Sequence, residues 1–295
     1  MTALVAPALP LSVPLASTRF SSASIIALTV VAAGASACGR ASIEPTTVRD
    51  SAGVAIVESH EHAWEASAAW SVDPVPILDL AATASGSTND FFRVSNAIRR
   101  ADGSIVVASR GSSTVSAYAP TGELLFSHGR AGDGPGEYRR LTSVAPYRGD
   151  SLVAFDYWQQ RLTILDADGT HTRVTTMEVP GGRAYTLHPV TDGRFVLRVN
   201  AFDQLRDPIG RKRIPQPLLV IHADGTVGDT VAVAAGFETF FFDGGDAAIP
   251  FGRESFIGTR GDTVIVGDAD HLGFREYTLD GQLQRIVRVP DFPLA

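Results

Sequence analysis

The fold of this chain is decided by one stretch of sequence, LTSVAPYRGDSLVAFDYWQQRLTILDADGTHTRVTTM (residues 141–177). It contains four β-rich runs, at 141–145, 151–155, 161–165 and 171–177. The turn dipeptides Gly149-Asp150 and Asp168-Gly169 separate the first run from the second and the third from the fourth. Short β-rich runs with turn residues between them predict four consecutive antiparallel strands.

The same arrangement returns along the chain. An opening turn precedes a β-rich run at Asp102-Gly103, Gly149-Asp150, Asp192-Gly193 and Gly261-Asp262, and a second turn follows at a fixed distance at Thr121-Gly122, Asp168-Gly169 and Asp280-Gly281. The units span about 91–129, 138–178, 184–234 and 251–289. Repeats of roughly 40–50 residues with several strands each are typical of propeller blades. The sequence therefore predicts an all-β propeller of four-stranded antiparallel blades with little helix.

Two further strands are expected before the first unit. Residues 53–58 form an uninterrupted β-rich run, and Trp70 to Leu80 contains a second run that Pro74 and Pro76 interrupt. If the run 53–58 pairs with the last run, 285–289, a closed propeller with few exposed edges becomes plausible. Otherwise the chain is an open arc that needs a partner or a missing segment.

Composition narrows the class of partner. The chain has 295 residues, 44% of them hydrophobic, which is enough for a substantial core. Its net charge of −7 argues against a nucleic-acid partner, because a phosphate backbone selects a basic face.

The N-terminal segment carries an export signal. Arg19 precedes an apolar run, 25–31, which leads into small residues and then Cys38, the single cysteine of the chain. Ala35-Ser36-Ala37-Cys38 resembles a bacterial lipobox, and the resemblance implies that Cys38 carries the lipid. We therefore expect a signal peptide over 1–37, a flexible tether over 38–50 and a propeller domain over 51–295. Ordinary cleavage after Ala37 and an uncleaved anchor are the alternatives.

A glycine-rich connection supports the fold from a second direction. Residues 129–138 read GRAGDGPGEY, and strand endings such as Ala154-Phe155-Asp156 close an apolar run on aspartate. Both features resemble the bacterial six-bladed β-propeller proteins related to NHL-repeat proteins. That family holds enzymes, carbohydrate- or peptide-contacting modules and proteins without an assigned role. Since four units are fewer than six blades, a smaller or divergent propeller and a truncated chain are both open. We expect the glycines to supply turns while Glu137 and Tyr138 pin the connection.

The irregular parts of the repeat fall at one end of the blades. Connections from second to third strand and from blade to blade lie there, at what we call the loop face, and the Asp-Gly turns lie at the opposite end, the turn face. From Gly193 to Gly225 the distance is 32 residues, against 19 in the other units, which predicts an inserted loop around 201–217. The basic run Arg211-Lys212-Arg213 is expected to be a solvated part of it. A second, aromatic loop is predicted over 236–245.

Aromatic side chains at the loop face are the candidate binding residues, since aromatics contribute a large share of interface energy. The set comprises Tyr157, Trp158, Phe240, Phe241 and Phe242, together with Arg206. The phenylalanines either anchor a partner or plug a junction between blades.

A metal site is the alternative. Asp156, Asp268, Asp270 and His271 stand at or just beyond strand ends, and a channel cation such as calcium, as in propeller lactonases, needs several such oxygens to converge. Asp156 and Asp268 occupy equivalent places in the repeat, so capping of the strand ends explains them as well.

Three functional hypotheses follow. The first is an envelope-anchored propeller lipoprotein, without catalytic residues or cofactor, that presents its loop face to a protein, peptide or glycan. The second is a metal-dependent hydrolase or lyase with its site at the channel mouth, and the third is a structural module of an envelope assembly. The expected location is the bacterial cell envelope through a lipid anchor, or, after ordinary cleavage, the periplasm or the exterior. We expect no nucleic-acid partner.

Overall fold

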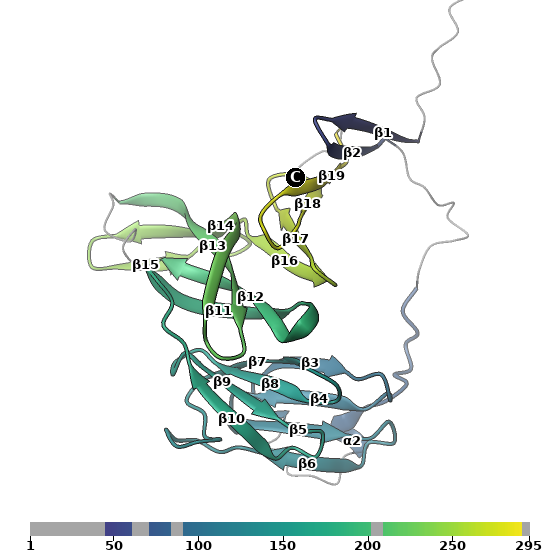
Figure 1. Cartoon of the computed structure of the whole chain (residues 1–295), viewed down its shortest axis with the longest axis vertical. Helices are drawn as coiled ribbons and strands as arrows, with labels where there is room; N and C mark the ends of the chain where they lie inside the picture. Colours follow the sequence, from purple (N-terminus) through teal and green to yellow (C-terminus); the bar gives the residue numbers. More distant parts are fainter. Residues whose placement is uncertain (1–44, 61–70, 84–90, 202–208, 291–295) are drawn as a thin grey trace, which may run out of the picture. The chain divides into compact units, whose positions relative to one another are not determined.

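The structure is a computed structural model that describes residues 45–60, 71–83, 91–201 and 209–290. These residues belong to one compact unit, Glu44–Ala295, and their strands form four sheets (Figure 1). The first two sheets are four-stranded: β3 (Val94–Arg99), β4 (Ile105–Ser109), β5 (Thr114–Tyr118) and β6 (Leu124–His128), then β7 (Leu141–Pro146), β8 (Leu152–Asp156), β9 (Arg161–Leu165) and β10 (His171–Thr176).

The other two sheets carry additional strands. The third contains β11 (Gly182–Pro189), β12 (Arg194–Ala201), β13 (Gly210–His222), β14 (Val227–Phe242) and β15 (Gly245–Ala248). The fourth contains β16 (Ser255–Arg260), β17 (Thr263–Asp268), β18 (Gly273–Tyr277) and β19 (Leu283–Arg288), extended by β2 (Val54–Ser59) and β1 (Thr46–Ser51). The described helical segments are short, α2 (Leu80–Thr83) and a 3₁₀ turn at Thr191–Gly193. Within the described ranges, no helix is long and apolar enough to cross a bilayer.

The apolar cores lie between successive sheets. In β8, Leu152 and Ala154 pack into a core with the first sheet, whereas Val153 and Phe155 pack into a core with the third. In β12, Val196 turns away from that core and joins one shared with the fourth sheet. Because successive strand residues point to opposite faces, a continuous apolar run buries both faces of a sheet. Antiparallel sheets that pack face to face in chain order define a β-propeller fold, as predicted.

The predicted turns lie where the repeat places them. Each joins the first strand of a unit to the second or the third to the fourth. The glycines in these turns all have positive φ, a conformation that costs glycine little: Gly103, Gly122, Gly149, Gly169, Gly193, Gly225, Gly261 and Gly281.

The glycine-rich connection is also as predicted. The carboxylate of Glu137 accepts a hydrogen bond from the Gly134 N–H at 2.8 Å, and the ring of Tyr138 is fully buried. Gly132 has positive φ, and a Cβ there would lie 2.0 Å from the Glu137 carboxylate. Arg161 donates to the carbonyl oxygens of Asp133 and Gly134 at 3.0 and 2.9 Å. Glu137, Tyr138 and Arg161 therefore hold the connection.

The N-terminal strand pairs with the last strand. β2 lies parallel to β19, with Ile56 opposite Ile286, so it extends the fourth sheet beyond its fourth strand. β1 then pairs with β2 and begins at Thr46, inside the segment expected to be a flexible tether. The strand predicted over Trp70 to Leu80 is wrong for the described part, 71–80, which has no strand and ends at the start of α2. Pro74 and Pro76 withhold two of the N–H donors that a strand would need.

Two predicted loops are strands instead. Residues 210–217 belong to β13 and residues 236–242 to β14, which pair with each other, and β15 adds a third strand on the far side of β14. We call the outer part of this sheet the ledge: Gly210–Arg213, Glu238–Phe242 and β15 (Figure 1). The extra residues of the third unit thus lengthen a hairpin whose backbone groups bond to each other rather than to water.

The pairing of β2 with β19 yields a stability prediction. Ile56 is 9% exposed in that strand, whereas Val48 of the neighbouring β1 is 69% exposed. We expect Ile56→Ala to lower the free energy of unfolding by about 2–4 kcal/mol, because it leaves a cavity beside Ile286. Val48→Ala is the matched control and should cost less than about 0.5 kcal/mol. Equal small losses in urea melts of the two variants would show that β2 does not contribute to the folded core.

Candidate functional site

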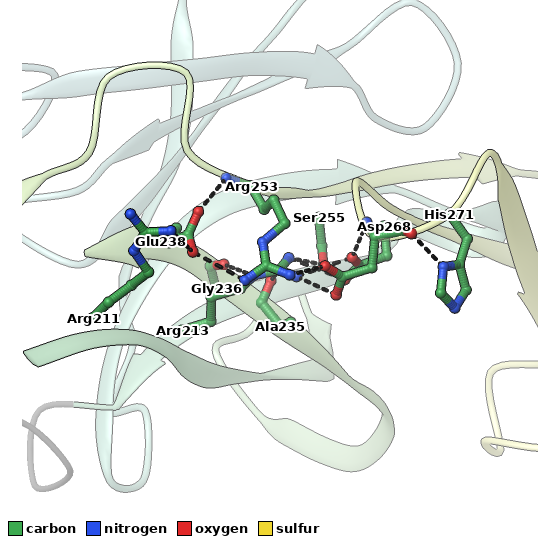
Figure 2. Close-up of polar contacts among 10 residues, drawn as sticks. Arg211, Arg213, Ala235, Gly236, Glu238, Arg253, Ser255, Asp268 and His271 are labelled. Atoms are coloured by element: carbon green, nitrogen blue, oxygen red, sulfur yellow. Dashed lines mark hydrogen bonds and ion pairs between the residues drawn. The ribbon is translucent and has the colours of Figure 1, made fainter. Parts of the chain in front are cut away.

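The ledge is fastened to the fourth sheet by one arginine. Arg213 of β13 meets the carboxylate of Asp268, at the end of β17, with both terminal nitrogens, at 2.9 Å to Oδ1 and 3.0 Å to Oδ2 (Figure 2). Its Nη1 also lies 2.8 Å from Oδ2 of Asp270, and its Nε donates to the Gly236 carbonyl oxygen at 2.9 Å. The Arg213 side chain is only 10% exposed. Two-point arginine–carboxylate pairs fix orientation as well as distance.

The groups around Asp268 keep its carboxylate ionised. It accepts hydrogen bonds from the Ser255 hydroxyl at 2.9 Å and from the Asp270 backbone N–H at 2.8 Å. Burial alone would raise the pKa of Asp268, but the Arg213 guanidinium and these two donors outweigh burial and hold that pKa well below its usual range.

A second arginine continues the network along the loop face. Arg253 donates to Oε1 of the buried Glu238 at 3.0 Å and contacts Asp270 with its other terminal nitrogen, while Arg211 lies 3.5 Å from the same Glu238 oxygen (Figure 2). The three arginines are matched by three carboxylates, those of Glu238, Asp268 and Asp270. The network is therefore neutral in sum, and its members are engaged with one another.

A row of rings and arginines lies beside this network. The rings of Tyr157 and Tyr185 meet edge to face at 5.9 Å, and Tyr185 meets Phe237 in the same way at 5.9 Å. Arg140 stacks over Tyr157 at 4.7 Å, and Arg198 stacks over Phe237 at 4.8 Å. Arg198 is buried, bonds Gln216 and Glu254, and donates to the Ser255 carbonyl oxygen, so the row adjoins the Arg213 network through Ser255.

Two hollows open near the junction of the third and fourth sheets. One, of about 230 Å³, lies at the loop face beside the Asp268–Gly273 connection and is lined in part by Asp270, His271 and Arg275. The other, of about 530 Å³, lies at the turn face and is lined by Asp262 and Asp280 among others. Asp262 accepts hydrogen bonds from Thr191 and Arg194, so it holds two sheets together there.

The candidate aromatic side chains differ in how far they are exposed, and in the ledge the alternation of the strand sets this difference. Phe240 and Phe242 are 45% and 47% exposed on one face of the ledge, and Phe241 on the other face is 8% exposed. Trp158 is 61% exposed, whereas Tyr157 is half-buried under Arg140. Within the run 240–242, Phe240 and Phe242 are thus exposed enough to contact a partner, whereas Phe241 is packed inside the protein. Arg206 and Cys38 lie outside the described residues.

The four candidate metal ligands do not come together. Asp156 ends β8 in the second sheet and accepts the backbone N–H groups of Arg139, Arg140 and Gln159. The other three lie in the fourth sheet, where arginines occupy both aspartates. Among the residues described, no three His, Cys, Asp or Glu side chains gather closely enough to hold a metal ion. Asp156 accepts these backbone N–H groups and Asp268 accepts the Asp270 N–H, as expected of residues that cap strand ends.

Sequence reasoning missed Arg213, which it placed in a solvated loop, and it gave no role to Arg198 or Arg253. The available signal was the spacing of Arg211 and Arg213, two residues apart as on one face of a strand, within an insertion long enough to extend a hairpin. The sequence did not reveal which residue Arg213 binds, because Asp268 stands 55 residues further along the chain.

The sheet topology defines the class of the protein, an all-β protein of the β-propeller type. No protein-family model matches the chain, and a search of curated proteins finds no relative. A search of solved structures matches it to a candidate exported protein from Bacteroides fragilis NCTC 9343, with 14% identity, a TM-score of 0.47, and coverage of 70% of this chain and 55% of that chain.

Two lyases match in the same search. One is a streptogramin B lyase, with 11% identity, a TM-score of 0.40, and coverage of 68% of this chain and 57% of that chain. The other is a catalytically inactive virginiamycin B lyase from Staphylococcus aureus with quinupristin, with 10% identity, a TM-score of 0.41, and coverage of 71% and 74%. The chain spans little more than half the length of the first two matched structures. At these values the likenesses carry no information about a ligand.

The lowered pKa of Asp268 gives a testable pH dependence. The unfolded chain protonates this carboxyl near its usual pKa of about 3.9, and the folded chain only at lower pH. Its contribution to stability is therefore complete above that usual value and is lost as the pH falls from there toward the lowered pKa. Asp268→Asn should cost about 1–3 kcal/mol at pH 7, and its deficit relative to wild type should shrink below about pH 4.

Urea melts of wild type and variant between about pH 7 and pH 3 measure this deficit. Asp280→Asn, at an exposed turn of the turn face, is the surface control and should cost less than about 0.5 kcal/mol at pH 7. A deficit for Asp268→Asn that stays constant down to the acid limit would contradict the ionised clamp.

Proposed function

We propose that this protein is a non-enzymatic binding propeller that presents its loop face to a protein, peptide or glycan partner in the bacterial cell envelope. The observation that carries the proposal is the ledge, a strand extension that holds Phe240 and Phe242 half-exposed on one face. Exposed aromatics on a rigid support lose little conformational entropy on binding, and such side chains dominate interface energies.

The charged network supports the same reading. Because Arg211, Arg213 and Arg253 are matched by Glu238, Asp268 and Asp270, these groups act on each other and position the ledge. Catalysis would instead call for a titratable group left free to exchange a proton or bind a metal. A metal-dependent hydrolase or lyase at Asp156, Asp268, Asp270 and His271 gains no support from this geometry.

The anchor is proposed from the sequence. Cys38 follows an apolar segment and small residues, in the order that resembles a lipobox, and thioether-linked lipid would place the propeller at a membrane surface. A short connection from 39 to 45 would then precede β1.

The partner test compares two faces of one strand. Phe240→Ala with Phe242→Ala should weaken retention of an envelope partner at least tenfold, since exposed aromatic anchors contribute about 1–3 kcal/mol each. The melting temperature should change little. Phe241→Ala, on the buried face, should instead destabilise the protein by about 3–5 kcal/mol.

Pull-downs from envelope extract, run beside thermal melts, separate these effects. If the double variant retains its partner as wild type does, the ledge is not the binding surface. If the double variant melts as early as Phe241→Ala, the two exposed rings are structural instead.

The anchor is tested by fractionation. Cys38→Ala should move the mature protein from the membrane fraction to the soluble fraction, because one residue carries the lipid. If the variant remains in the membrane fraction after a carbonate wash, the protein is held by an uncleaved anchor and not by a lipid on Cys38.

A further inference from the structure

The 230 Å³ pocket at the loop face has an apolar floor. Its apolar lining includes Val266 and Ile286, which share one face of the fourth sheet, and its polar lining includes Asp268, Asp270, His271, Arg275 and Arg288. Val266 is also part of the core between the third and fourth sheets, so the floor is continuous with packed structure. Val266, Arg275 and Ile286 lie side by side in the strand register, which places Arg275 within the lining between two apolar neighbours.

Most charged side chains of this pocket are already bound to other residues of the protein, but one is not. Asp268 and Asp270 are bound to Arg213, and Arg288 is bound to Glu58. His271 contacts the Asp270 carbonyl oxygen with Nδ1. The Arg275 side chain is exposed and has no ion pair or hydrogen bond with any described residue. The uncommitted charge facing a ligand is therefore positive.

We propose that this pocket receives one apolar side chain of a peptide or protein partner, and that an acidic residue next to it in the partner pairs with Arg275. This proposal rests on the binding function above and selects a partner class within it. The volume is below the roughly 300 Å³ of sites for whole small molecules, so it suits a single side chain. A floor of two aliphatic side chains, Val266 and Ile286, offers a sugar few partners for its hydroxyl groups, since Asp268, Asp270 and Arg288 of the lining are already in ion pairs.

The test uses defined peptides and the whole propeller. In spectra of ¹⁵N-labelled protein, the capped tripeptide acetyl-Glu-Leu-Glu-amide should shift the amides of residues 273–275 and 286–287. The uncharged acetyl-Gln-Leu-Gln-amide should bind about tenfold more weakly. Arg275→Gln should remove this difference between the two peptides. Its matched control is Arg285→Gln, an exposed arginine of β19 that pairs with Glu276.

Three outcomes overturn the proposal. Equal affinity of wild type for the two peptides would mean that Arg275 is not the anionic contact, and shifts confined to other residues would mean that the pocket is not the site. Binding of an acidic uronate tetrasaccharide at residues 273–287, without binding of either peptide, would assign the pocket to a glycan. The binding function itself stands or falls separately: if Arg275→Gln keeps the envelope partner while the double phenylalanine variant loses it, only the pocket assignment fails.

Discussion

The guanidinium of Arg213, in two-point contact with Asp268, is the interaction on which the loop face depends. It joins β13 of the third sheet to the end of β17 in the fourth, and the same guanidinium bonds the Gly236 carbonyl oxygen in the strand between. Burying an ion pair has a desolvation cost, which only good geometry and further hydrogen bonds offset. Ser255 and the Asp270 N–H supply those bonds, so the clamp is a satisfied network rather than an isolated pair.

Two kinds of interaction therefore hold different parts of the molecule. The sheets are held by apolar cores that alternate from face to face, as Val153 and Ala154 do in β8. The ledge is paired within its own sheet and held to the fourth sheet by the Arg213 ion pairs, while Phe240 and Phe242 on one of its faces stay half-exposed to water. Ion pairs hold the ledge without covering these rings, whereas an apolar contact at the same place would have buried them. The same arrangement leaves Arg275 as the open charge of the adjoining pocket.

The parts of the fold that the sequence predicts are those with local causes. Glycine in an Asp-Gly turn and a continuous apolar run such as 152–155 act within a few residues, and both were predictable. The ledge was not, since the run Phe240-Phe241-Phe242 lacks alternation in residue type although its burial alternates. The role of Arg213 was hidden for another reason, because its partner lies 55 residues away and only the packing of two sheets brings them together.

Hydrogen exchange of the ledge in Arg213→Gln and wild type tests the central claim most directly. If the clamp holds the ledge, amides of residues 210–213 and 238–242 exchange at least tenfold faster in the variant, while those of the first and second sheets are unchanged. Unchanged exchange of the ledge in a variant that still folds would contradict the claim, because the strand pairing would then hold the ledge without Arg213.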